Sequence, residues 1–261
     1  MNLAGDGWSV EQADSLQWLQ DPGDRAGTVD AFVTDPPYSS GGALRTDRTN
    51  ATTLVKYRAT GASLLPEFTG DNRDQRSFTL WCSLWMAAAR PWARPGGSLC
   101  CFADWRQLPA VSDALQAGGW VWRGVAVWRK PAHRARPVAG GFWNDTEFIL
   151  WGTNGPLDTA RWDRCLPGVF EGAAPAEKVH ITEKPLEVLE QVVEIAPPGG
   201  LIVDPFAGSG TTGVAALRQG RRFMGVEYDR RFVEVSAARC WNTQRMAPLD
   251  APPEAVTLWG E

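Results

Sequence analysis

The sequence has few of the residues that build metal sites and disulfide frameworks. Its 261 residues include two histidines, His133 and His180, which lie far apart, and five cysteines without a C-x-x-C pair. Zinc sites and disulfide scaffolds need such residues at close spacing, so we expect neither, and no metal is predicted.

Long apolar runs are missing as well. Nowhere do 18 consecutive apolar residues occur, and residues 1–10, MNLAGDGWSV, lack the basic flank and apolar stretch of a secretion signal. We therefore expect a cytoplasmic protein with no membrane partner. The content of 44% hydrophobic and 21% charged residues is typical of globular proteins, and 261 residues suffice for a single domain with a sizeable core.

Acidic residues are absent from one stretch of an otherwise acidic protein. The formal net charge is −4, yet residues 114–144 contain no Asp or Glu and carry Arg123, Arg129, Lys130, Arg134 and Arg136. Such a basic strip is typical of a surface that contacts phosphates, although distant acidic residues could equally balance it in space. The candidates for contact with nucleic acid are Arg129, Lys130, Arg134 and Arg136.

Short β-rich apolar runs alternate with stretches of helical spacing along most of the chain. We expect strands at 30–34, 98–102, 120–130, from 147, from 201 and at 222–227, and helices near 80–90, at 108–116, from 185 and from 211. This alternation predicts an α/β fold with a mostly parallel, doubly wound sheet. Three apparently irregular inserts, which are the candidates for substrate recognition, interrupt it at 39–76, 131–146 and 153–179.

A glycine-rich turn joins an expected strand to an expected helix near the end of the chain. It reads VDPFAGSGTTGVAA, begins at Val203, and has Glu227 at the end of the next expected strand. Glycines let the backbone turn tightly against a ligand, and an acidic residue on the second strand can hold ribose hydroxyls. The pattern predicts a nucleoside cofactor, fits NAD as well, and on its own could be a simple turn.

The stretch FVTDPPYSS, from Phe32 to Ser40, places two prolines between a carboxylate and an aromatic ring. Proline fixes its own φ and restricts the residue before it, so Asp35 and Tyr38 are held rigidly apart. In isolation this would be interpreted as a turn.

Together, TDPPY and DPFAGSGTTG resemble the catalytic and cofactor motifs of the DNA amino-methyltransferases, which use S-adenosylmethionine. The catalytic motif comes first, with the recognition region between the two motifs, which is similar to the permuted beta-group arrangement of that family. ADSL at 13–16 and HITEKP at 180–185 also resemble family segments, although Ala13 replaces the usual glycine. Asp14 and Thr182 could also be simple helix caps.

The resemblance implies a Rossmann-like methyltransferase fold and a set of site residues. The expected catalytic residues are Asp35, Pro36, Pro37 and Tyr38. The expected cofactor-binding residues are Asp14, Asp35, His180, Thr182, Lys184, Asp204, Pro205, Phe206, Ala207, Gly208, Gly210, Thr211, Thr212 and Glu227.

The same resemblance implies methyl transfer to the N6 amino group of an adenine rotated out of duplex DNA. Aspartate at the first motif position is usual for the adenine enzymes of the family, so cytosine N4 is the second candidate. An NAD-dependent oxidoreductase would normally have its glycine-rich turn near the start of the domain, and an inactive DNA-binding regulator would not need Asp35 and Tyr38. A homodimer and a cognate restriction enzyme stay open as partners.

Overall fold

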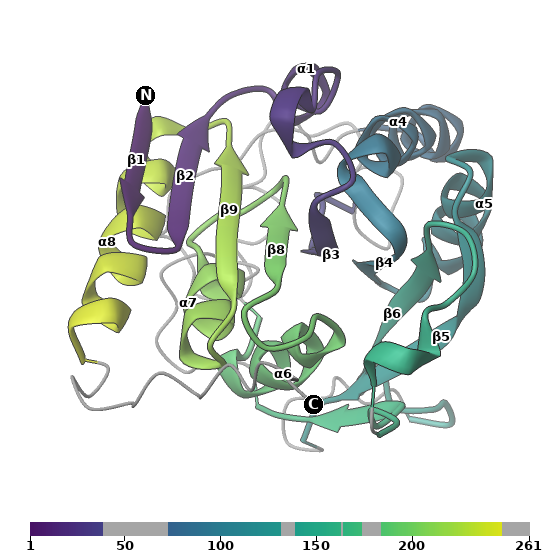
Figure 1. Ribbon diagram of the computed structural model, residues 1–261. Helices are drawn as coiled ribbons and strands as arrows, with labels where there is room; N and C mark the ends of the chain where they lie inside the picture. The colour runs from purple at the N-terminus through teal and green to yellow at the C-terminus, as the bar shows by residue number, and fades with distance from the viewer. Residues whose placement is uncertain (39–72, 132–138, 163, 174–183, 247–261) are drawn as a thin grey trace, which may run out of the picture.

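The computed structural model describes residues 1–38, 73–131, 139–162, 164–173 and 184–246. Within these ranges, nine strands form one sheet in the order β1-β2-β9-β8-β3-β4-β6-β5-β7 (Figure 1). The strands are β1 (Asn2–Gly5), β2 (Trp8–Gln12), β3 (Val29–Thr34), β4 (Ala93–Ala103), β5 (Val121–Arg129), β6 (Thr146–Thr153), β7 (Val169–Glu171), β8 (Leu201–Asp204) and β9 (Arg222–Glu227).

Parallel pairing runs through the middle of the sheet, from β2 through β9, β8 and β3 to β4, and recurs between β5 and β7. Antiparallel pairing joins β1 to β2 and places β6 between β4 and β5. The expected mostly parallel α/β sheet is therefore confirmed. Since β6 runs against β4, its first residues lie at the edge where the parallel strands end.

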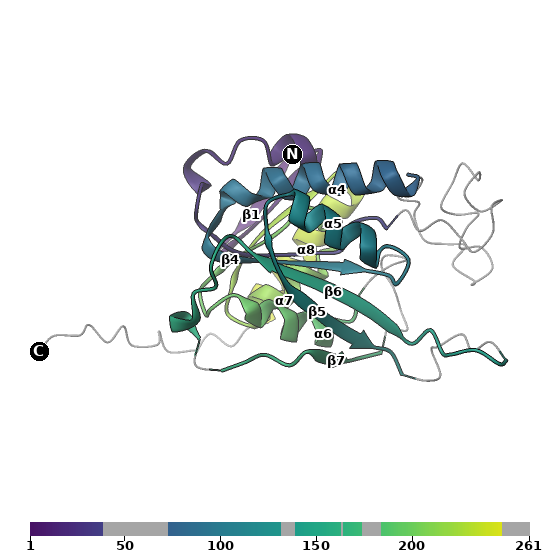
Figure 2. The same cartoon turned by 90° about the vertical axis from the view of Figure 1, so that its right-hand side faces the viewer.

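Helices cover both faces of the sheet. Figure 2 shows α4 and α5 on one side and α6 and α7 on the other. The α-helices are α1 (Ser15–Trp18), α4 (Gln75–Ala89), α5 (Leu108–Ala117), α6 (Leu186–Val192), α7 (Thr211–Arg218) and α8 (Arg230–Met246). Short 3₁₀ helices occur at η1 (Gly23–Arg25), η3 (Arg90–Trp92), η5 (Thr159–Arg161) and η6 (Val193–Ile195).

The central strands are buried because helices exclude water from both of their faces. Every residue of β3 and of β8 is buried, which explains why these strands are nearly continuous apolar runs without alternation. One hydrophobic cluster joins the sheet to α6, α7 and α8, and a second joins it to α4 and α5. This packing holds the ends of the central strands, and the side chains that follow them, in fixed positions.

The structure corrects parts of the sequence interpretation. The insert at 153–179 was expected to be irregular, but it contains η5 and β7, and only Phe170 of β7 is buried. A three-residue strand with one buried side chain is too short to produce a periodic pattern. Helix α4 begins at Gln75, inside the insert expected at 39–76, and β1 and α8 were not predicted at all. Residues 39–72 and 132–138 lie outside the described ranges.

Candidate active site

The glycine-rich turn connects β8 to α7 as the sequence predicts. Gly208 and Gly210 have φ of +50° and +80°, a region that other residues rarely adopt. A β-carbon on Gly210 would also overlap the side chain of Ser236 on α8. Arg239, on the same helix, donates hydrogen bonds to the backbone oxygen and to Oγ of Ser209, both at 3.0 Å. The turn is therefore fixed from α8 as well as from its own ends.

Asp204 holds the start of this turn through both carboxylate oxygens. Oδ1 accepts hydrogen bonds from Thr34 Oγ1 at 2.6 Å and from the backbone N–H of Phe206 at 3.0 Å, and Oδ2 accepts one from Thr212 Oγ1 at 2.7 Å. Burial raises the pKa of Asp204 to about 6, although the donated hydrogen bonds oppose this shift. Asp204 thereby connects the end of β3, the turn and the first residues of α7.

The raised pKa of Asp204 predicts a particular dependence of stability on pH. Its pKa is about 6 in the folded protein against the ordinary 3.8 of an aspartate carboxyl in the unfolded chain, so the folded state binds this proton more tightly. The resulting stabilisation is complete below about pH 4 and is lost as pH rises through 6, a change of about 3 kcal/mol. We expect Asp204→Asn to lack this component. Denaturant unfolding of the wild type and of Asp204→Asn from pH 4 to 7.5 measures this component. The raised pKa of Asp204 would be contradicted if the free energies of unfolding of the two proteins changed in parallel with pH.

Glu227 lies beside the turn, at the end of β9. Its Oε2 accepts a hydrogen bond from Gly208 N at 2.9 Å and its Oε1 accepts one from Asp229 N at 2.8 Å. Burial raises its pKa, and hydrogen bonds from the backbone of Asp229, Gly208 and Tyr228 oppose that shift. A carboxylate offers about four lone-pair positions, so both oxygens can still accept hydrogen bonds from ribose hydroxyls. The cradle of glycines and this carboxylate fit a nucleoside cofactor.

The N-terminal segment ADSL also reaches this region. Ala13 N donates to the backbone oxygen of Glu227 at 3.1 Å, and Ser15 Oγ donates to the carbonyl of Pro205. Asp14 caps α1 by accepting a hydrogen bond from Gln17 N at 3.0 Å. The cap that the sequence offered as an alternative is present, and cofactor binding by Asp14 stays a prediction.

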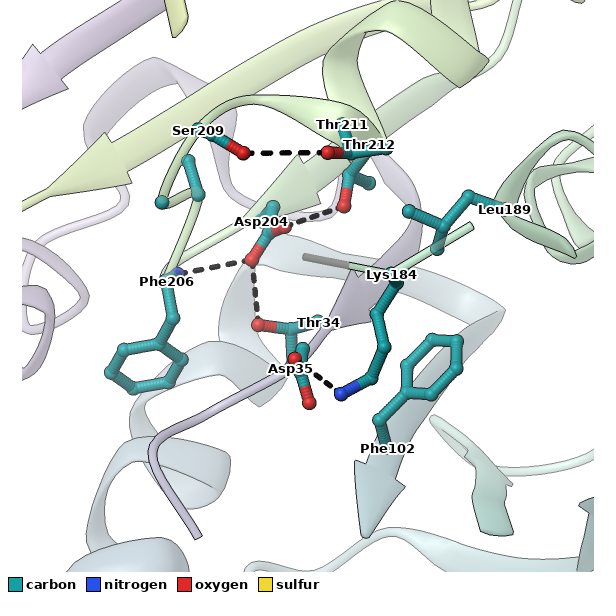
Figure 3. A pocket seen from close by; sticks show the side chains of 12 residues that line it. Thr34, Asp35, Phe102, Lys184, Leu189, Asp204, Phe206, Ser209, Thr211 and Thr212 are labelled. Carbon is teal, nitrogen blue, oxygen red and sulfur yellow. Dashed lines mark hydrogen bonds and ion pairs between the residues drawn. The ribbon is translucent and has the colours of Figure 1, made fainter. Parts of the chain in front are cut away.

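Asp35 follows the last residue of β3 and lines the same cavity as the glycine-rich turn, with its carboxylate toward Lys184 (Figure 3). Its Oδ2 forms an ion pair with Lys184 Nζ at 2.7 Å. Its Oδ1 is buried and accepts no hydrogen bond of good geometry from the described part of the chain, although the Tyr38 hydroxyl lies close enough to Asp35 to lower the pKa of this carboxylate. Burial raises the pKa of Asp35, while the ammonium of Lys184 opposes the shift. A buried carboxylate oxygen without a donor is costly, so this atom is suited to accept a hydrogen bond from a bound molecule.

Lys184 sits between the catalytic motif and the cofactor turn. A single cavity is lined by the turn, Asp35, Lys184 and Phe102 (Figure 3). Lys184 Nζ lies 4.9 Å from the ring centroid of Tyr38 and 5.6 Å from that of Phe102. Two carboxylates raise its pKa above the ordinary range although burial acts in the opposite direction, so the ammonium is charged. The expected cofactor residue is thus also a direct partner of the catalytic motif.

Glu147 is a site residue that the sequence interpretation missed. Its Oε1 pairs with Lys130 Nζ at 2.7 Å and its Oε2 pairs with Lys184 Nζ at 3.2 Å. Tyr38 OH lies 3.4 Å from the same Oε2. Burial alone would raise the pKa of Glu147, but Lys184 and Lys130 hold it below its ordinary value. Only the antiparallel direction of β6 brings the start of this strand to Asp35, and the sequence does not display that direction.

The structure divides the predicted basic strip. Arg129 pairs with Glu171 at 2.5 Å and Lys130 with Glu147, so both described candidates already have acidic partners. Arg123 bonds Thr153 and Gly155 toward the opposite end of β5, about 20 Å from Arg129 for a strand of this spacing. The strip is therefore not continuous along β5. DNA contact by Arg129 and Lys130 stays a prediction, and Arg134, Arg136, His180 and Thr182 lie outside the described ranges.

These features together define a class of protein. A mostly parallel sheet carries a glycine-rich nucleoside turn after β8, an acidic residue at the end of β9 and a DPPY motif after β3, beside that turn. This is the arrangement expected for a Rossmann-like methyltransferase that acts on amino groups.

The particular family follows from comparison with known proteins. The pattern of the DNA methylase family of N6 and N4 methyltransferases matches residues 29–164 and 157–238. The chain belongs to this DNA methylase family. Membership confirms the predicted cofactor, S-adenosylmethionine, on which the family depends.

Individual relatives agree with this assignment. The chain is 25% identical over 231 residues to the type II methyltransferase M2.DpnII of Streptococcus pneumoniae, covering 81% of this chain and 82% of that protein. The crystal structure of an M1.HpyAVI–SAM complex is similar with a TM-score of 0.63 and 23% identity, over 89% of this chain and 98% of that one. The cytosine-N4-specific PvuII DNA methyltransferase has a TM-score of 0.65 and 16% identity, over 89% and 86% of the two chains.

The described residues also bear on the expectations about membranes and metals. No helix there is long and apolar enough to cross a membrane. Across the same residues, no group of His, Cys, Asp and Glu side chains is arranged to hold a metal ion. The five cysteines are all free thiols, four of them buried.

Proposed function

We propose that the protein transfers a methyl group from S-adenosylmethionine to the N6 amino group of adenine in DNA, with the target base rotated out of the duplex. The observation that carries this proposal is Asp35 Oδ1, a buried oxygen without a hydrogen-bond donor beside the cofactor turn. Aspartate at this motif position favours adenine, because the adenine enzymes of the family usually carry it.

The chain's own residues would prepare the amino nitrogen for reaction. Its lone pair is delocalised into the ring, so the free amino group is a weak nucleophile. Asp35 Oδ1 and the carbonyl of Pro36 can each accept one N–H, and two such bonds favour a pyramidal nitrogen. Neither proline has an N–H that could occupy that carbonyl in a local turn.

The bound cofactor supplies an electrophilic methyl group on a positively charged sulfur. As positive charge develops on the amino nitrogen, the Asp35 carboxylate stabilises it, and fixed geometry favours in-line attack. Asp35 therefore assists without having to be a strong base. The methyl group would pass to the amino nitrogen as its bond to sulfur breaks, leaving S-adenosylhomocysteine, and the nitrogen would then release one proton to water so that its lone pair returns to the ring.

Tyr38 is the residue that we propose to hold the extruded base. Extrusion costs a few kcal/mol, and stacking on an aromatic ring returns about 1–3 kcal/mol. The ammonium of Lys184 lies over one face of the Tyr38 ring. We assign the opposite face to the base and propose that the amino group of the base then points toward Asp35.

Cytosine N4 is the second candidate, because the cytosine-N4-specific PvuII enzyme shares the fold. The test is transfer of a labelled methyl group to unmethylated DNA, followed by nucleoside mass spectrometry. We expect N6-methyladenine. N4-methylcytosine would select the alternative, and methylation of neither base would refute the proposal.

Salt dependence tests the proposed DNA surface. Exchanging Arg134 and Arg136 for alanine should weaken DNA binding and reduce the slope of log K against log salt by up to about 2, because each phosphate contact contributes roughly one unit. Arg123→Ala is the matched control, since this residue of the same strip bonds Thr153 and Gly155 instead. Fluorescence anisotropy from 50 to 300 mM salt measures the slopes, and an unchanged slope in the double variant would place the surface elsewhere.

A further inference from the structure

Glu147 is the second residue of β6, the strand that pairs antiparallel with β4. It reaches the active site because β6 begins at the edge where the parallel strands end. Phe148, the next residue, pairs with Ala103 at the very end of β4. The Glu147 side chain is 16% exposed and lies among Asp35, Lys184, Lys130 and Tyr38. We propose, on the basis of the function above, that Glu147 is a positioning residue that holds Lys184 so that one oxygen of Asp35 stays open for the target base.

The argument starts from the needs of a buried ammonium group. Lys184 is 7% exposed, so water cannot satisfy its three N–H donors, and an unpaired charge at this depth is strongly unfavourable. The described acidic partners of Nζ are Asp35 Oδ2 at 2.7 Å and Glu147 Oε2 at 3.2 Å. The ammonium is shared between two carboxylates, and Asp35 uses only one of its oxygens.

Removing the charge of Glu147 would leave Asp35 as the only carboxylate among these partners of Lys184. The ammonium would then move toward Asp35 and take Oδ1 as well, the atom assigned to the amino group of the base. Lys130 fixes Glu147 from the other side, through Oε1 at 2.7 Å, so Glu147 cannot follow Lys184. With two carboxylates and two ammonium groups the cluster is also electrically balanced, and the substitution would leave an excess positive charge where positive charge develops in the reaction.

The same Glu147 oxygen lies 3.4 Å from Tyr38 OH. One carboxylate thus contacts both the cation that pairs with Asp35 and the ring proposed to stack on the base. Displacement of a reacting group by about 1 Å can reduce a rate by 10²-fold, so the loss of this contact is expected to affect kcat.

The experiment compares Glu147→Gln with Glu171→Gln. Glu171 is the matched control because it pairs with Arg129, the last residue of β5 and the chain neighbour of Lys130. Its side chain is 66% exposed, and its described ion pair is with Arg129 and not with Lys184 or Lys130. For Glu147→Gln we expect a 10- to 100-fold lower single-turnover rate on DNA, with the Kd for S-adenosylhomocysteine within twofold of the wild type. Glu171→Gln should change neither value.

A double-variant cycle separates positioning from a structural role. If Glu147 acts through Lys184, adding Glu147→Gln to Lys184→Gln should slow transfer by less than threefold beyond Lys184→Gln alone. Multiplicative losses would overturn the proposal, as would a Glu147→Gln rate within twofold of the wild type. Loss of S-adenosylhomocysteine affinity in parallel with the rate would mean that Glu147 only supports the fold, and would overturn it too.

A measurement without DNA distinguishes this proposal from the proposed function. If the wild-type protein methylates no DNA, the proposed function fails, but the pairing of Lys184 can still be tested by a ¹³C NMR titration of Asp35. Glu147→Gln should lower the pKa of Asp35, because a negative neighbour is lost and Lys184 moves closer, whereas Glu171→Gln should leave it unchanged. An unchanged pKa in Glu147→Gln would overturn the positioning role. The titratable groups that act on or alongside Asp35 are Lys184, Glu147, Tyr38, Cys101 and Asp204.

Discussion

Asp35→Ala is expected to reduce methyl transfer by about 10²–10⁴-fold while leaving cofactor binding largely intact. The carboxylate is the charged group proposed to contact the reacting nitrogen, and alanine removes both its charge and its acceptor. The cofactor turn does not depend on it, because that turn is held by Asp204, Glu227 and Arg239.

The measurements are single-turnover transfer on DNA and calorimetric titration with S-adenosylhomocysteine. Asp35→Asn serves as the companion variant, since it keeps an acceptor oxygen but loses the charge, and it should retain more activity than alanine. Lys184 keeps Glu147 as a partner in either variant, so we expect the fold to persist. Undiminished transfer by Asp35→Ala would remove this residue from the mechanism.

Gly210→Ala is expected to abolish cofactor binding and to destabilise the fold by about 2–4 kcal/mol. The left-handed conformation at φ +80° contributes roughly 1–2 kcal/mol of this, and overlap of the new methyl group with Ser236 contributes the rest. Because Gly210 is the N-cap of α7, any relief of the overlap displaces the helix start and Thr212, which bonds Asp204.

Gly220→Ala provides the matched control. Gly220 has a similar φ of +67°, but its added β-carbon would meet no atom within 4 Å. It should therefore show only the conformational component, about 1–2 kcal/mol, with unchanged affinity for the cofactor. Denaturant unfolding and titration with S-adenosylhomocysteine separate the two variants, and equal behaviour would show that the contact with Ser236 has no effect.

The residues whose role depends on local geometry could be predicted from the sequence. The turn from Asp204 to Thr212 has to bend within a few residues, so its glycines are visible in the sequence itself. Asp35 follows a buried strand and precedes two prolines, and this too is a local pattern. In each case, the side chain's place at the carboxyl edge follows from the parallel α/β sheet, which alternation along the chain already predicts.

Residues that depend on strand direction and register could not be predicted in this way. Glu147 reaches the site because β6 is antiparallel to β4, and Arg239 reaches the turn because α8 packs beside α7. The basic neighbours of Lys130 predict a DNA contact, and they do not indicate the ion pair with Glu147 that the structure adds. Charge along a sequence does not indicate which acidic side chain will lie beside it after folding.

The pairing of β5 with β6 has a consequence for how such an enzyme could acquire new target sequences. The ladder extends to Arg129 and Thr146, and Lys130 N donates to the backbone oxygen of Asp145 at 2.6 Å beyond it. Lys130 and Asp145 are thus held at fixed points, and doubling the number of residues between two fixed points costs only about 0.6 kcal/mol in closure entropy for a flexible chain. We therefore expect insertions and exchanges between these two points to leave Lys130 and Glu147 in register beside Lys184 and Asp35. On the proposed function, recognition of new target sequences through residues 131–146 would not require the residues around Asp35 to move.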